Sequence, residues 1–169
     1  LVEPRFARFF LNKALGKYNY FDDLKSLDAD LYGSLASLKR MAPEALESLD
    51  LRFEVTSLLR DQATDVALLP NGRETRVTAA NRGQYVQLVA HYRLNVETAR
   101  PAGAFLRGLR AVVPARWLRL FSPEELQTLV SGADARVDVS DWRAHAHYGG
   151  GYHPSQPIIR WFWEVVEEF

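Results

Sequence analysis

Three histidines in the last third of the chain lie close together in the sequence: His145, His147 and His153, beside Asp141. Neutral imidazole is a good donor to zinc, so a cluster of this kind could hold a metal ion. Neither an HExxH sequence nor any cysteine accompanies these histidines. We therefore interpret them as surface or packing residues, and we expect neither a metal site nor a cofactor.

A run of three glycines follows the first two histidines and lies between Tyr148 and Tyr152. Glycines can let the backbone approach a phosphate, but here no Lys-Ser or Lys-Thr follows, and the context is not the strand–loop–helix of a P-loop. Because glycine readily adopts positive φ, a tight structural loop that includes Gly150 and Gly151 is the better interpretation.

No group of residues has the pattern of a catalytic centre. The chain contains no cysteine, which excludes a thiolate nucleophile within it, and it has no Gly-x-Ser-x-Gly sequence. The paired acids Glu124-Glu125 and Glu167-Glu168 stand at predicted helix ends, where carboxylates act as caps or face solvent. The residues alone therefore predict no reaction carried out by this chain.

Five arginines occur without an intervening acid, which is a pattern that could bind RNA or DNA. They are Arg100, Arg107, Arg110, Arg116 and Arg119. The whole chain has 21 Lys plus Arg against 21 Asp plus Glu, so its formal net charge is zero. We expect a solvated helix face and no nucleic-acid partner, with nucleic-acid binding kept as an alternative.

The elements that position these residues belong to a protein of ordinary globular composition. The chain has 169 residues, of which 47% are hydrophobic and 25% charged, and this suits one domain or two small subdomains. No apolar run approaches the roughly 20 residues of a membrane-spanning helix, so we expect no membrane span.

Both ends of the chain are strongly apolar. Residues 158–169 read IIRWFWEVVEEF, which predicts a helix buried nearly all round, and Phe6, Phe9 and Phe10 lie on an apolar helix near the start. Such helices need partners from elsewhere, so we expect a piece of a longer polypeptide, incomplete at both ends. A compact domain with helical ends is the alternative.

The first half of the chain changes its hydrophobic period twice. A helix is predicted over 3–16, and Asp28 can cap a second helix over 29–40. Alternation over 49–55 then predicts a strand, and Val66 and Leu68 alternate less cleanly. The turn Pro70-Asn71-Gly72 after them predicts a short return strand over 73–77.

Further helices are predicted after this small antiparallel sheet. They cover 79–94 and, beyond Pro101, 102–112. Ser122-Pro123-Glu124-Glu125 has the cap, proline and third-position glutamate of a helix start, and Gly132 is placed to end that helix. The fold class is therefore α+β, predominantly α-helical, with a small antiparallel β-sheet between helices.

Several long stretches resemble the catalytic domain of HECT ubiquitin ligases, in the same order and over essentially the whole chain. They are SLDADLYGSLASLKR (26–40), LDLRFEV (49–55), LPNGRETRVTAANRGQYVQLVAHYRLN (69–95), AFLRGLRAVVP (104–114), WLRLFSPEELQTLVSGA (117–133), YGGGY (148–152) and IIRWFWEVVEEF (158–169). The opening FARFFLNKALG is similar to the branch typified by ubiquitin ligases E3B and E3C.

The resemblance implies part of a two-lobed domain. Its N-lobe recruits a ubiquitin-charged conjugating enzyme, and its C-lobe carries the cysteine that takes ubiquitin as a thioester. This chain resembles the later part of the N-lobe, so we expect it to be inactive alone. The resemblance implies a conjugating-enzyme-binding subdomain over 28–96 and a larger helical subdomain formed by 1–27 and 97–169.

The family's hydrophobic groove for the conjugating enzyme corresponds to seven residues of this chain. They are Leu31, Ser34, Leu35, Leu49, Leu51, Tyr85 and Val89. The pairs Leu31/Leu35 and Tyr85/Val89 each stand one helical turn apart and form stripes. A groove and a core use the same residue types, so core packing remains the alternative. The family's Gly-Gly-Tyr loop is retained at Gly150, Gly151 and Tyr152.

The implied partners are a ubiquitin-conjugating enzyme, ubiquitin, and a protein substrate bound through regions outside these residues. The implied location is intracellular, either cytoplasmic or nuclear. A stand-alone helical interaction module with no ubiquitin-transfer role is the alternative, because the chain itself contains no nucleophilic cysteine.

Overall fold

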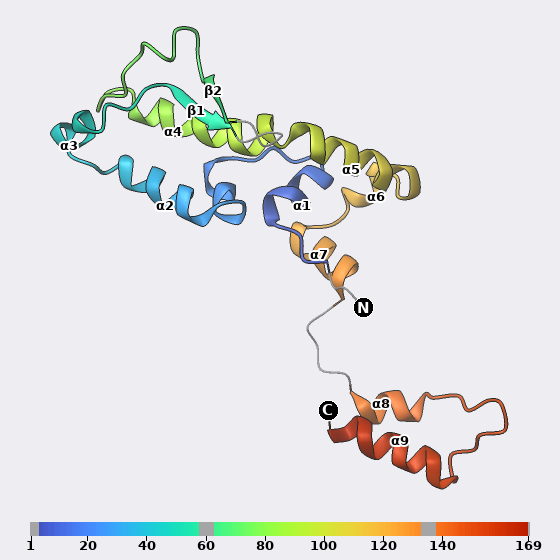
Figure 1. Ribbon diagram of the computed structural model, residues 1–169. Coiled ribbons are helices and arrows are strands. Elements are labelled where there is room, and N and C mark those ends of the chain that lie inside the picture. The colour runs from blue at the N-terminus through green and yellow to red at the C-terminus, as the bar shows by residue number, and fades with distance from the viewer. Residues whose placement is uncertain (1–3, 58–62, 133–137, 169) are drawn as a thin grey trace. The chain divides into compact units, whose positions relative to one another are not determined.

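The computed structural model describes residues 4–57, 63–132 and 138–168, and Figure 1 shows its elements. The chain forms two units, Leu1–Gly132 and Ala133–Phe169. The architecture is α+β and mainly helical, with a two-stranded antiparallel sheet between helices, which confirms the predicted fold class. No helix in the described part of the chain has the length and apolar character needed to cross a membrane.

The first unit begins with four short helical elements: α1 (Arg8–Ala14), the 3-10 helix η1 (Phe21–Ser26), α2 (Ala29–Leu38) and α3 (Pro43–Ser48). The Asp28 carboxylate accepts a hydrogen bond from the Leu31 N–H at 2.8 Å, so the predicted cap of α2 is confirmed.

Helix α1 is shorter than the predicted helix over 3–16. Ala7, immediately before α1, is extended. The carbonyl of Pro4 accepts hydrogen bonds from the side chains of Gln127 and Ser131, so the segment before α1 is bound to a helix far along the chain and does not extend α1. Gly16 has a φ of +73°, a left-handed conformation that ends the helix.

The sheet consists of β1 (Glu54–Ser57) and β2 (Thr64–Ala67), paired antiparallel with Glu54 opposite Ala67. The prediction of a return strand over 73–77 is wrong, because only a single bridge, Arg52 to Arg76, forms there. The Phe53 N–H instead binds the carbonyls of Gly72 and Thr75, so the turn packs against the start of β1. A Cβ on Gly72 would lie 2.3 Å from the Phe53 oxygen, which explains glycine at this turn.

A long helical run follows, made of α4 (Arg82–His91), one π-helical turn η3 (Tyr92–Glu97) and α5 (Ala99–Val112). Pro101 does not separate two helices as predicted. It lies in the first turn of α5, where backbone N–H groups make no hydrogen bond within the helix, so proline is tolerated there.

Two short helices, α6 (Ala115–Leu118) and α7 (Pro123–Ser131), complete the first unit. The predicted capping box of α7 is confirmed. The Ser122 N–H donates to Glu125 Oε2 at 2.7 Å, and the Glu125 N–H donates to Ser122 Oγ at 3.1 Å. Gly132, at a φ of +83°, ends α7.

Two apolar clusters stabilise the first unit. The first core gathers residues from α1, η1, α2 to α4, the sheet region and η3: Phe9, Phe21, Leu24, Leu35, Leu46, Phe53, Val55, Val77, Tyr85, Val86, Val89, Ala90, Tyr92 and Leu94. The second core gathers residues of α1, its C-cap and α5 to α7: Leu11, Ala14, Leu15, Leu106, Leu118 and Leu126. The predicted subdomain boundaries at 28 and 96 fall within this unit and stay a prediction.

The second unit contains α8 (Val139–Ala144) and α9 (Pro157–Glu168). Trp163 is buried at 2% exposure and packs edge-to-face on Trp142, with ring centroids 5.2 Å apart. Within this unit α9 is not buried all round, since Trp161 is 63% exposed and Phe162 is also exposed, and its burial by partners from elsewhere stays a prediction.

Candidate partner-binding site

Helix α2 carries three of the seven predicted groove residues. Leu35 is buried in the first core, and Leu31 is half-buried against that core. Ser34 is exposed, and its hydroxyl donates to the Asp30 carbonyl at 2.9 Å. The helix therefore turns its leucines inward and leaves Ser34 at the surface.

The segment between α3 and β1 carries two more of these residues. Asp50 has a φ of +43°, and its carboxylate is 3.2 Å from the Arg76 guanidinium. This sharp bend separates Leu49, which is 48% exposed at the end of α3, from Leu51, which is half-buried against the first core. Leu49 is the most accessible leucine of the predicted groove.

Helix α4 carries Tyr85 and Val89, and both are buried in the first core. The Tyr85 ring is 8% exposed and meets Phe53 edge-to-face with centroids 5.5 Å apart. Burial raises the pKa of the Tyr85 hydroxyl, and the negative charge of Glu54 raises this pKa further. Tyr85 is thus a neutral phenol at neutral pH.

Five of the seven residues meet around one apolar cluster: Leu31, Leu35, Leu51, Tyr85 and Val89. Core packing explains Leu35, Tyr85 and Val89 without any partner. The more accessible residues of the set are Leu31, Ser34, Leu49 and Leu51, which we call the predicted edge, and contact between them and a protein partner stays a prediction.

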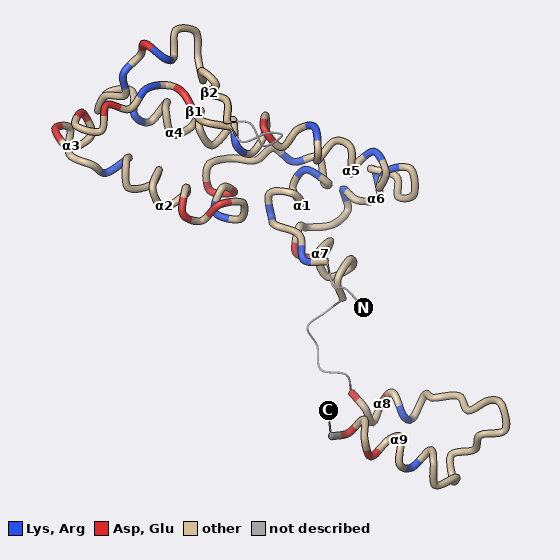
Figure 2. The backbone as a smooth tube through the Cα atoms, in the orientation of Figure 1, with Lys and Arg blue, Asp and Glu red and all other residues tan. Residues whose placement is uncertain are grey.

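The charges around the predicted edge are of both signs, because exposed Lys39 and Arg40 follow α2 and the Asp50 carboxylate pairs with Arg52 and Arg76. Exposed carboxylates stand at the start of α2, along α3 and at the bend after it, where Figure 2 shows the red segments: Asp28, Asp30, Glu44, Glu47 and Asp50. The opposite charge dominates α5 and α6, where the five arginines of the sequence pattern are all exposed. Accessible apolar side chains flanked by charges of both signs can bind a protein surface with a complementary pattern.

The histidines do not gather into one site. His145 Nδ1 lies 3.3 Å from Asp141 Oδ1, one turn earlier in α8, and His153 Nδ1 is 2.9 Å from Ser155 Oγ. Within residues 4–57, 63–132 and 138–168, no three His, Cys, Asp or Glu side chains come together as a metal site would need.

The glycine loop has the expected backbone. Gly150 and Gly151 have φ values of +67° and +89°, which explains glycine at both positions. Tyr148 accepts a 2.9 Å hydrogen bond from Trp163 Nε1, so this end of the loop is attached to α9. Tyr152 is exposed, and the structural role of the Gly-Gly-Tyr loop stays a prediction.

The second core contains a cavity of about 330 Å³ between α1 and α5 to α7. Every residue that lines it is apolar, including Phe6, Phe10 and Leu118. A cavity of this kind has no group to transfer a proton or hold a metal, so it offers no catalytic chemistry.

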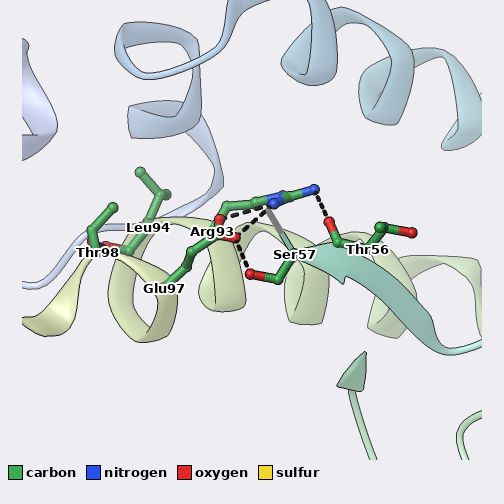
Figure 3. Close-up of polar contacts among 6 residues, drawn as sticks. All are labelled: Thr56, Ser57, Arg93, Leu94, Glu97 and Thr98. Atoms are coloured by element: carbon green, nitrogen blue, oxygen red, sulfur yellow. Dashed lines mark hydrogen bonds and ion pairs between the residues drawn. The ribbon is translucent and has the colours of Figure 1, made fainter. Parts of the chain in front are cut away.

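The sequence did not predict a polar cluster at η3 (Figure 3). Arg93 forms an ion pair with Glu97 at 2.8 Å, and Glu97 also accepts a 2.7 Å hydrogen bond from Ser57 Oγ. The spacing of Arg93 and Glu97, four residues apart on a helix, is the only local signal for it. Ser57 could not be linked to them by sequence, because it lies on β1.

The comparison with protein families distinguishes a HECT-domain fragment from a stand-alone helical interaction module. The family model described as "HECT-domain (ubiquitin-transferase)" matches residues 1–169. The chain belongs to the HECT-domain family. The match covers the same stretches that carried the resemblance, so the proposed family is confirmed.

Curated HECT relatives agree with this assignment. The chain is 40% identical over 169 residues to "E3 ubiquitin-protein ligase UPL6" of Arabidopsis thaliana, covering 100% of this chain and 16% of the relative. It is 34% identical over 171 residues to human "Ubiquitin-protein ligase E3B", covering 98% of this chain and 16% of the relative. It is 39% identical over 173 residues to "E3 ubiquitin-protein ligase HUL5" of Saccharomyces cerevisiae, covering 100% and 19%. The chain thus spans less than a fifth of each relative.

Proposed function

We propose that this chain is the part of a HECT ubiquitin ligase that recruits a ubiquitin-charged conjugating enzyme. The HECT match over the whole chain is the observation that carries the proposal. The partial exposure of Leu31, Leu49 and Leu51 supports it, because these residues of the predicted groove leave apolar surface accessible to a partner.

In this proposal the chain contributes proximity rather than a reacting group. It contains no cysteine, so it cannot itself form a thioester with ubiquitin. It holds the charged conjugating enzyme so that a cysteine outside these residues attacks the thioester carbonyl, and the thiolate of the conjugating enzyme leaves. The ubiquitin then passes to a lysine of a substrate bound through other regions of the ligase. An intracellular location follows from these partners.

The test is a titration of the 169-residue chain with a panel of ubiquitin-charged conjugating enzymes. Leu49→Asp is the site variant, and Leu120→Asp is its matched control, since Leu120 is also an exposed leucine just after a helix. Burying half a leucine contributes about 1 kcal/mol, so we expect Leu49→Asp to weaken binding by roughly fivefold or more.

The control variant is expected to bind like the unaltered chain. Equal binding by both variants would show that the predicted edge is not the docking surface. If no charged conjugating enzyme binds a folded chain, the recruitment function is wrong, and the interaction-module interpretation takes its place.

A further inference from the structure

The two cores of the first unit are joined through few elements. Helix α1 contributes Phe9 to the first core and Leu11 to the second, so its opposite sides hold the two together. The chain also passes from one core to the other at η3, where Leu94 is buried in the first core and Leu106, on α5, in the second. The turn η3 is therefore a joint between them.

Directional polar contacts attach this joint to the end of β1 (Figure 3). Arg93 Nη1 donates to both carboxylate oxygens of Glu97, at 3.0 and 2.8 Å, and Arg93 Nη2 donates to the Thr56 carbonyl at 2.9 Å. Ser57 is buried, and its hydroxyl donates to the same carboxylate at 2.7 Å. The side chains of Arg93 and Glu97 are 26% and 17% exposed, so water screens this pair only weakly.

Other polar contacts attach η3 on the side of α1. Asn95 Nδ2 donates to the Asn19 carbonyl at 3.0 Å. Asn19 is buried, and its amide donates to the Phe9 carbonyl and accepts from Asn12 Nδ2, both at 2.9 Å. The joint is therefore held between the loop after α1 and the last residues of β1.

These contacts restrict the angle between η3 and β1. The planar guanidinium donates along two fixed directions, to Glu97 and to Thr56, so it allows only a narrow range of orientations between η3 and β1. A π-helical turn is a weak element by itself and is often found at functional positions in helices.

We infer that Arg93, Glu97 and Ser57 form a positioning clamp that fixes the orientation of the first core relative to α5 and the second core. The consequence for catalysis rests on the proposed function, because a conjugating enzyme docked on the first core is then presented at a fixed angle. The clamp itself requires no partner, so it can be tested independently.

The chain contains no cysteine, so a pair of spin labels can be placed without removing native residues. Exposed alanines are available on both sides of the joint, and we choose Ala45→Cys on α3 and Ala111→Cys on α5. Pulsed electron–electron double resonance then measures the distribution of distances between the labels. A single narrow distribution is expected for the chain with an intact clamp.

Arg93→Ala removes every clamp contact of the guanidinium and is expected to broaden the distribution or add a second population. A hydrogen bond to a charged group corresponds to about a tenfold change in an equilibrium, so displaced orientations should rise by roughly that factor. Ser57→Ala removes one contact and should broaden the distribution less. Arg143→Ala removes an exposed ion pair to Glu167 within the second unit, and serves as the control with no change expected.

An unchanged distribution in folded Arg93→Ala would overturn the inference. If Arg93→Ala unfolds and loses its helical circular dichroism, the distance distributions of Ser57→Ala and Arg93→Lys test the clamp instead, because both variants keep the charge of Glu97 paired. An unchanged distribution in these two milder variants would then also overturn it.

A second readout separates positioning from general support of the fold. In the ligase that contains this chain, Ser57→Ala should lower the maximal single-turnover rate of ubiquitin transfer. It should leave the half-saturating concentration of charged conjugating enzyme unchanged, because the docking edge is intact. A rise in that concentration with no fall in rate would contradict the positioning role. Failure of every conjugating enzyme to bind would refute the proposed function, whereas the distance measurement would still test the clamp.

Discussion

Replacing Tyr85 with alanine separates the core role of this residue from its predicted role in a groove. The ring is 8% exposed and packs edge-to-face on Phe53 in the first core. Truncating a buried aromatic side chain to alanine costs about 3–5 kcal/mol. Since a domain of this size is stable by about 5–15 kcal/mol, Tyr85→Ala should remove a large part of the free energy of unfolding.

The assay is urea unfolding followed by circular dichroism, with Tyr20→Ala as the matched control. Tyr20 is 67% exposed, so its truncation should change the free energy of unfolding by no more than about 0.5 kcal/mol. Equal stability of the two variants would refute the placement of the Tyr85 ring in the core. Loss of partner binding in a Tyr85→Ala chain of undiminished stability would instead favour the groove.

Three further perturbations test the local chemistry. Because the pKa of Tyr85 is raised, its contribution to stability is fully present below the ordinary tyrosine pKa near 10 and is lost as pH rises through the folded pKa. In Tyr85→Phe, the free energy of unfolding from urea titrations should therefore fall less steeply at alkaline pH. Ser122→Ala should cost about 1 kcal/mol through loss of the α7 cap. Hydrogen bonds from the backbone and side chain of Ser122 lower the pKa of Glu125, so the contribution of this carboxylate is present above its ordinary pKa of 4.5 and disappears as pH falls through the folded value. An α7 amide protection factor, corrected for the intrinsic exchange rate at each pH, that stays constant as pH falls would contradict this. Gly72→Ala would place a Cβ 2.3 Å from the Phe53 oxygen and should destabilise the turn severely, and a melting temperature equal to that of the unaltered chain would count against this close approach.

Features set by neighbouring residues could be predicted from the sequence. The caps formed by Asp28 and Ser122 are contacts within three residues, and Gly132 ends α7 through its own conformation. The alternation after residue 50 also persists, since Phe53, Val55 and Ser57 are all buried.

Features set by distant residues could not be predicted in this way. The return strand predicted over 73–77 does not form, and the Phe53 N–H is taken by the turn at Gly72. The strand β1 pairs instead with 64–67, where the sequence alternates only weakly. The clamp depends on Ser57 meeting Glu97, two residues 40 positions apart. In the candidate site, Leu49 and Tyr85 both belong to the predicted groove, yet Leu49 is accessible and Tyr85 is buried. Residue type alone cannot separate a groove from a core.

The most direct test of conjugating-enzyme recruitment is amide hydrogen exchange of the chain with and without a ubiquitin-charged conjugating enzyme. Recruitment at the predicted edge should slow exchange in α2 and around Leu49 to Leu51, and leave α5 to α7 unchanged. Protection confined to α5 to α7, or no protection anywhere at a saturating concentration of the charged enzyme, would contradict the proposal.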